Sequence, residues 1–187
     1  MSFRYLPCVL ILAALTTACS GSDDDVHVLG GSTDFINNRI TLHDGVVTIK
    51  ASGVPDATVN AQGQLAIDGH DVAVNDAQRT LLQSYNAAAQ TMRTDAIATG
   101  KAGASTATQA VTAAADKITG AEGAEAVRAK AEEAAANVKQ AAAKICEDVA
   151  TMKSAQDELA TQLEAFKPYA HALGDANVEK CRKDTAQ

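Results

Sequence analysis

The chain lacks tryptophan and has few aromatic residues of any kind, which limits the core that it can build. Phe and Tyr number three each among 187 residues. Because aromatic side chains bury the most apolar area, a core without them relies on aliphatic side chains and alanine. An excess of basic residues is also missing, since 16 Lys and Arg stand against 23 Asp and Glu, for a net charge of -7. We therefore expect no nucleic-acid partner.

The motifs of common enzyme classes are missing too. The sequence contains no nucleophile elbow, phosphate-binding loop or dinucleotide fingerprint. The histidines lie in four separate segments without metal-ligand spacing, at His27, His43, His70 and His171. Only His43 and His70, beside predicted hairpins, are candidates for a metal site assembled in space. We predict that the protein is not an enzyme and holds no metal or cofactor.

No apolar run is long enough to cross a membrane. Residues 6–18 form a mostly apolar stretch of 13 residues, whereas a transmembrane helix needs about 20. Arg4 precedes this stretch, and small residues lead from it to Cys19. This order predicts a signal peptide over residues 1–18 and a lipidated Cys19. Thr16 departs from the branched aliphatic residue preferred there, so an ordinary signal peptide cleaved within residues 20–25 is the alternative.

The lipoprotein interpretation also predicts a location. Ser20 beside the lipidated cysteine favours the outer membrane of a Gram-negative bacterium, with the protein facing the periplasm. So acidic a chain would be held at the membrane by acyl chains rather than by a basic patch. Residues 19–38 then read as the lipidated cysteine and a flexible tether.

The cysteines have separate roles in this interpretation. Cys8 leaves with the signal peptide and Cys19 carries the lipid, so Cys146 and Cys181 remain. Two thiols in an exported protein usually form a disulfide, and two free buried thiols are the alternative. Positions 35 residues apart lie about 50 Å apart along one helix, so a disulfide requires the chain to reverse between them. Pro168 marks the expected reversal.

Residues 39–75 have the alternating pattern of short strands. Strands are predicted at residues 40–43, 46–50, 57–60, 64–67 and 71–74. Asp44-Gly45 and Asp68-Gly69 are dipeptides that favour two-residue hairpin turns. The sequence therefore predicts a small antiparallel β-hairpin module.

A helical pattern follows from Asn75, which forms a capping box with Gln78. The first helix is expected to reach about residue 117. Between residues 86 and 145 there are 23 alanines, and large apolar residues become sparse after Met92. Alanine favours helix but buries little area, so these helices depend on close packing. Glycines among residues 100–104 could admit a partner helix.

A second helix, beginning near residue 119, carries a heptad pattern. Its apolar positions are Val138, Ile145, Met152, Leu159 and Phe166, with a companion seam at Ala135, Ala142, Val149, Gln156 and Leu163. An intramolecular helical hairpin over residues 76–166 is favoured. An intermolecular coiled coil and a single continuous helix are the alternatives.

Residues 167–187 are predicted to form a C-terminal tail. The fold class is thus α+β, a small β-hairpin module followed by a long Ala-rich helical hairpin.

The junction of the module and the first helix resembles a known family. The residues in question are Gly63-Gln64-Leu65-Ala66-Ile67-Asp68-Gly69-His70, Ala77-Gln78-Arg79-Thr80-Leu81-Leu82 and Tyr85. Over residues 40–105 or so, they are similar to the YggN family of uncharacterised exported proteobacterial proteins. The resemblance implies an envelope location and no known enzymatic activity, and it transfers no catalytic residue.

Arg79 and Tyr85 are the best candidates for ligand binding, because Arg79 offers a cation near a helix N-terminus. In a purely structural interpretation, Arg79 pairs with Asp68 or Asp71 and Tyr85 fills the sheet–helix interface.

We expect a non-enzymatic envelope lipoprotein that binds or scaffolds an envelope protein through its helical region. The alternative is a periplasmic small-ligand-binding protein or hydrolase with a site between the sheet and the first helix. Homo-oligomerisation is the less favoured option.

Overall fold

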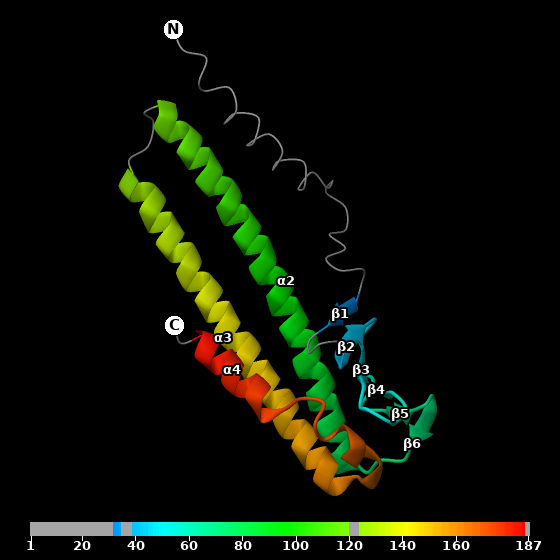
Figure 1. The fold of residues 1–187 in the computed structure, drawn as a ribbon. Helices are drawn as coiled ribbons and strands as arrows, with labels where there is room; N and C mark the ends of the chain where they lie inside the picture. Colours follow the sequence, from blue (N-terminus) through cyan, green and yellow to red (C-terminus); the bar gives the residue numbers. More distant parts are fainter. Residues whose placement is uncertain (1–31, 35–38, 120–123, 186–187) are drawn as a thin grey trace. The chain divides into compact units, whose positions relative to one another are not determined.

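The computed structural model describes residues 32–34, 39–119 and 124–185, with side chains for residues 39–108, 129 and 131–183. The predicted signal peptide over residues 1–18 and Cys19 lie outside the described residues. Figure 1 shows a small sheet beside the lower part of two long antiparallel helices. This architecture confirms the α+β prediction. Among the described helices, none has both the length and the apolar character to cross a membrane.

The sheet is an antiparallel meander in which each strand pairs with the next along the chain. Its six strands are β1 (Ser32–Asp34), β2 (Ile40–His43), β3 (Val46–Ile49), β4 (Ala57–Val59), β5 (Leu65–Ile67) and β6 (His70–Val72). β1 lies in the segment predicted as tether, so the module begins before residue 39. β1 pairs with β2 through backbone groups, which a search for alternating apolar residues does not detect.

Both predicted hairpin turns are present. Asp44 and Gly45 have φ values of 48° and 76°, and Asp68 and Gly69 have 52° and 75°. Two successive residues with positive φ are required by the turn whose twist matches that of the flanking strands. The two dipeptides therefore set the register of β2 against β3 and of β5 against β6.

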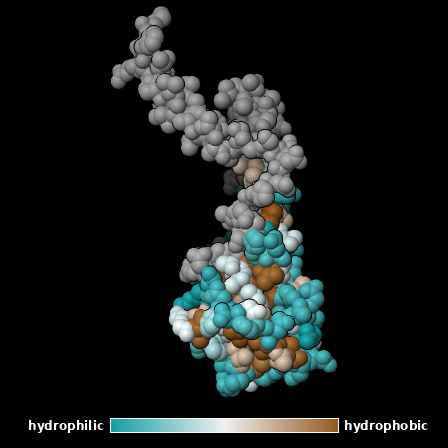
Figure 2. Space-filling view, turned by 90° about the vertical axis from the view of Figure 1, so that its right-hand side faces the viewer, coloured by the Kyte–Doolittle hydropathy of each residue, from teal (hydrophilic) through white to brown (hydrophobic). Residues whose placement is uncertain are grey.

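One face of the sheet packs against α2 (Asp76–Thr119). This inner face consists of aliphatic residues that are at most 1% exposed, namely Ile40, Leu42, Val47, Ile49, Ala57, Val59 and Leu65. Strand pairing places Thr41, Thr48 and Thr58 in a row on the other face, where each is half-buried. From the side of the sheet, hydrophilic residues frame the described surface and hydrophobic ones gather near its lower centre (Figure 2).

The helical hairpin is formed by α2 and α3 (Ala124–Gln162), which pack against each other. The capping box predicted at the start of α2 is present, because Asn75 Oδ1 accepts from Gln78 N at 2.9 Å and Gln78 Oε1 accepts from Asn75 N at 3.0 Å. Side-by-side packing of α2 and α3 rules out the single continuous helix.

The end of α3 differs from the prediction. The helix stops at Gln162, and Phe166 lies in the 3₁₀ helix η2 (Glu164–Tyr169). Leu163 is extended, with φ -131° and ψ 106°, and Pro168 cannot donate the backbone hydrogen bond that an α-helix needs. Phe166 is nevertheless fully buried in the core, so the heptad pattern indicated its burial and not its conformation.

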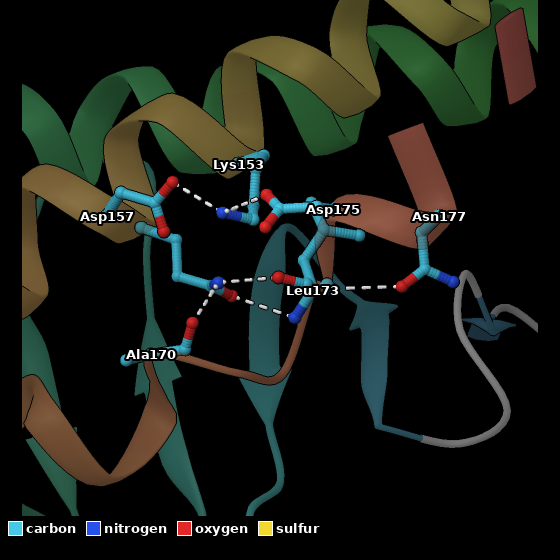
Figure 3. Close-up of polar contacts among 8 residues, drawn as sticks. Lys153, Asp157, Ala170, Leu173, Asp175 and Asn177 are labelled. Atoms are coloured by element: carbon cyan, nitrogen blue, oxygen red, sulfur yellow. Dashed lines mark hydrogen bonds and ion pairs between the residues drawn. The ribbon is translucent and has the colours of Figure 1, made fainter. Parts of the chain in front are cut away.

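The tail folds back as helix α4 (Asp175–Thr185) along α3. The predicted disulfide joins Cys146 to Cys181, with the Cα atoms 5.6 Å apart. Lys153 Nζ contacts the Asp157 carboxylate on its own helix and lies 2.9 Å from Asp175 Oδ1 at the start of α4 (Figure 3). Burial alone would lower the pKa of Lys153, but hydrogen bonds to Asp157 and Asp175 outweigh this effect and raise it.

Gly63 sits where the sheet approaches α2, and its substitution provides a test of this packing. Its φ is +69°, and a Cβ there would lie 2.5 Å from the Arg79 carbonyl oxygen. Gly53 has a similar φ of +80° with no atom within 4 Å of its Cβ position. We expect Gly53→Ala to lower the free energy of unfolding by about 1 kcal/mol and Gly63→Ala by about 3 kcal/mol. Urea denaturation followed by circular dichroism measures the free energy of unfolding of both variants. Equal losses of stability in the two variants would contradict the close approach of Gly63 to the Arg79 backbone.

Candidate functional site

The lower part of the α2–α3 seam is filled with large side chains. Met92 from α2 and Met152 and Leu159 from α3 are at most 5% exposed. Buried polar groups tie this region to its neighbours, since Asn86 Nδ2 donates to the carbonyl oxygens of Gly45 and Val59, each at 2.9 Å. This part of the hairpin is therefore closed.

Farther along the hairpin, the side chains in the seam become small. An open groove of about 620 Å³ lies between the two helices there. Its lining residues are Asp95, Ala98, Thr99, Ala102, Gly103 and Thr106 of α2, and Ala134, Ala135, Asn137, Val138, Lys139, Ala141 and Lys144 of α3. We call this feature the hairpin groove. Alanine and glycine cannot reach across the space between two helices, so the helices pack without filling it.

Val138 is the exception among these small residues. Its side chain is 43% exposed, and it is the one exposed large hydrophobic residue among the described side chains. The heptad positions that follow it on α3 become progressively buried, from half-buried Ile145 to Met152 at 1% and Leu159 at 0%. The apolar stripe predicted from the sequence is thus covered at its C-terminal end and open at Val138.

The polar groups of the groove are of three kinds. The Thr99 and Thr106 hydroxyls donate to backbone carbonyls one turn earlier, at 2.6 and 2.9 Å. Asn137 supplies an amide, while Asp95, Lys139 and Lys144 supply charges of both signs. The lining therefore combines a largely apolar floor with a few neutral and charged groups, a composition typical of ligand pockets.

Two carboxylates interact unfavourably near the lower end of the groove. Asp148 Oδ2 is buried and has no hydrogen-bond partner among the described residues. Burial raises the pKa of Asp148 above its ordinary value of 3.8, and repulsion from Asp95 and Glu147 raises it further. Since Asp95 lies on α2 and Asp148 on α3, this repulsion opposes close packing of the two helices there.

The two ligand-binding candidates occupy different environments. Tyr85 is fully buried in the core, and its hydroxyl has no hydrogen-bond partner among the described residues. Burial raises its pKa. Arg79 is half-buried and lines an open depression of about 330 Å³ with Asp71 and Gln64, among others, and Tyr85 is not part of that lining. The structure does not bring Arg79 and Tyr85 into one cavity.

The other predicted site residues are also separate. His43 lies 3.1 Å from the carboxylate of Asp44, while His70 contacts the carbonyl oxygen of Asp68 in its own turn. In the part of the chain that the structure describes, no group of three or more His, Cys, Asp or Glu side chains could hold a metal ion. Cys146 and Cys181 are joined by the disulfide.

Sequence reasoning missed the structural roles of Asn86 and Gln156. The heptad pattern places Gln156 in an apolar seam, yet its side chain is fully buried and bonds to the backbone of Ala170 and Leu173. A polar residue in an apolar heptad position was the available signal. For the groove, the signal was the loss of large apolar residues after Met92.

Replacement of Asp148 tests the repulsion at the groove. A raised pKa means that the folded chain binds a proton more tightly than the unfolded chain, so stability falls as pH rises above 3.8 through the folded pKa. We expect Asp148→Asn to raise the free energy of unfolding at pH 7 and to lose this advantage toward pH 3. Exposed Glu158→Gln is the control, with little effect at either pH. Denaturation at several pH values measures both, and an advantage independent of pH would contradict this account.

Comparison with known proteins adds a family and no activity. The model of a family described as "Protein of unknown function (DUF2884)" matches residues 35–130, which include β2 to β6, all of α2 and the start of α3. No curated protein and no solved structure matches the chain. The matched segment exceeds half of the 187 residues, and the chain belongs to the DUF2884 family of proteins of unknown function.

Proposed function

We propose that this protein is a non-enzymatic bacterial envelope lipoprotein that binds another envelope component through the hairpin groove. The observation that carries the proposal is the change in the α2–α3 seam, which is filled at Met92 and Met152 and open around Val138. An exposed apolar concavity of this size is unfavourable in water, so a bound partner would gain from covering it.

The chemistry of the lining supports binding rather than catalysis. The groove residues include no histidine, cysteine or serine, and the two threonine hydroxyls are hydrogen-bonded to their own helix. A nucleophilic hydroxyl donates to an adjacent base, whereas Thr99 and Thr106 donate to the backbone carbonyls of Asp95 and Ala102. In this proposal the groove acts through shape and apolar contact.

The proposed location rests on the sequence of the first 20 residues. Arg4, the apolar residues 6–18 and Cys19 form the signal and lipid-attachment pattern, and Ser20 favours the outer membrane. We also propose that the family match corresponds to the YggN-like group, since residues 35–130 include the segment that carries that resemblance. The groove would then work in the periplasm.

Lipid attachment is tested by metabolic labelling with radioactive palmitate. We expect the full chain to incorporate label in Gram-negative cells and the Cys19→Ser variant to lose it. Cys8→Ser is the matched control, because Cys8 precedes the proposed cleavage site and its loss leaves the lipidated residue intact. Label that persists in Cys19→Ser would contradict the proposed anchor.

Binding at the groove is tested by photo-crosslinking in cells. A photoreactive amino acid at Val138 is expected to give crosslinks, because this side chain is exposed at the groove. The control places the same amino acid at Ala143, which is exposed, does not line the groove, and lies about 140° around α3 from Val138. Equal yields at the two positions, or none at Val138, would contradict binding at the groove.

A further inference from the structure

The shape of the hairpin groove limits what can fill it. We infer that its occupant is an amphipathic α-helix of a partner protein, with bulky aliphatic side chains at positions i, i+4, i+7 and i+11. This inference rests on the proposed function and specifies the partner. The occupant would lie along α2 and α3 as a third helix, inserting its apolar face between them.

The length of the groove fits a short helix. Its lining runs over residues 95–106 of α2 and 134–144 of α3. At about 1.5 Å per residue, these segments extend about 16 and 15 Å. A helix of about 16 Å has about 12 residues, and one face of it carries four side chains at the spacing given above.

The volume of the groove leads to the same number. Removing one large core side chain leaves a cavity of about 150 Å³. The groove volume of about 620 Å³ therefore corresponds to about four bulky side chains. The length and the volume of the groove thus both correspond to four large residues on one helical face.

The described side chains of a second copy do not supply those residues. Among them, Val138 is the one large hydrophobic residue that is exposed. With these side chains, two hairpins packed groove to groove would each insert one valine into a space that holds about four bulky side chains. Most of the volume would stay empty, which favours a different molecule as the occupant.

A lipid acyl chain fits the openness of the groove less well than a helix. An acyl chain is apolar on all sides, so the side facing away from the floor would stay in water. An amphipathic helix buries its apolar face on Val138 and the alanines and turns its polar face outward. The exposed lining residues indicate that the groove is open along its length.

A third helix already packs on α3. α4 contacts the side of α3 that includes Ala150, Lys153 and Asp157, and the disulfide fixes it at Cys146. The nearest groove residue on α3 is Lys144, and the two positions that separate it from Cys146 correspond to about 200° around an α-helix. The groove therefore lies on a different side of α3 from α4, and a partner helix there would pack on α3 in addition to α2 and α4.

Filling the groove from within tests the inference. Ala102 and Ala141 both line it, so Ala102→Leu and Ala141→Leu would place side chains of the protein itself in the space. We expect each change to raise the thermal midpoint by a few degrees, because each added side chain becomes partly buried between the two helices. We also expect each to weaken partner binding at least tenfold. Ala143→Leu, outside the groove, should change neither quantity. Higher stability together with lost binding separates groove filling from misfolding.

The binding probe is a fluorescent peptide of about 16 residues with leucines at i, i+4, i+7 and i+11 and polar residues elsewhere. Its control has the same composition, with the leucines distributed around the helix. We expect fluorescence anisotropy to detect binding of the first peptide alone, and circular dichroism to show a gain in helix on binding. Equal binding of both peptides, or unchanged affinity in Ala102→Leu and Ala141→Leu, would overturn the inference.

Mass spectrometry of the Val138 crosslinks distinguishes the two proposals. A partner segment with the four-residue apolar pattern supports the helix, provided that its synthetic peptide binds the purified protein and loses affinity in Ala141→Leu. Crosslinks to a phospholipid, to a second copy of this chain or to a segment without the pattern would overturn the helix and leave groove binding intact. Crosslinking at Val138 no stronger than at Ala143 would overturn groove binding itself.

Discussion

Buried side-chain amides hold the sheet, the two long helices and the tail together. The buried polar residues among the described side chains are Gln78, Asn86 and Gln156, and all three are amides. Each bonds to backbone groups of another segment: Gln78 to Gln162, Asn86 to Gly45 and Val59, and Gln156 to Ala170 and Leu173. An amide both donates and accepts, so it can satisfy loop and helix-end groups that would otherwise be buried without partners. The aliphatic core can form only because these groups are satisfied.

The same constraint explains why the hairpin has two different parts. Its lower part has the sheet and η2 around it, and Tyr169 donates to the carbonyl oxygen of Pro55 at 2.6 Å, which joins η2 to the loop before β4. The part around Val138 is made of two Ala-rich helices whose small side chains leave the groove between them. At the groove, α2 and α3 make fewer dispersion contacts with each other. Repulsion between Asp95 and Asp148 opposes a closer approach of the two helices. The part of the hairpin near the sheet and η2 is thus well packed, whereas the part around Val138 is packed incompletely. The proposed binding surface lies on this second part.

The tail contributes to this anchoring with two different interactions. The Cys146–Cys181 disulfide restricts the unfolded chain, an effect of about 2–4 kcal/mol in typical proteins. Lys153, only 14% exposed, lies between Asp157 and Asp175 and joins α3 to the start of α4. Together they fix α4 against the side of α3 that carries Cys146 and Lys153.

Local patterns were sufficient for the strands, their turns and the start of α2. Asp44-Gly45, Asp68-Gly69 and the capping pair Asn75 and Gln78 act through neighbouring backbone, so their conformations follow from short segments. The heptad pattern indicated the burial of Met152 and Leu159, and the two remaining cysteines indicated the disulfide. β1 and the end of α3 were missed, because β1 is defined by backbone pairing with β2 rather than by alternating apolar residues, and the heptad pattern continues across the extended Leu163 into η2.

The order of the elements and the loss of large side chains after Met92 can be read directly from the amino-acid sequence. The covered and open parts of the apolar stripe cannot, because Val138 and Met152 occupy equivalent heptad positions yet are 43% and 1% exposed in the folded chain. Helical periodicity defines a face, but burial depends on what packs against that face. The sheet, η2 and α4 accompany the lower part of the hairpin, and beyond them the small side chains of the two helices leave a groove.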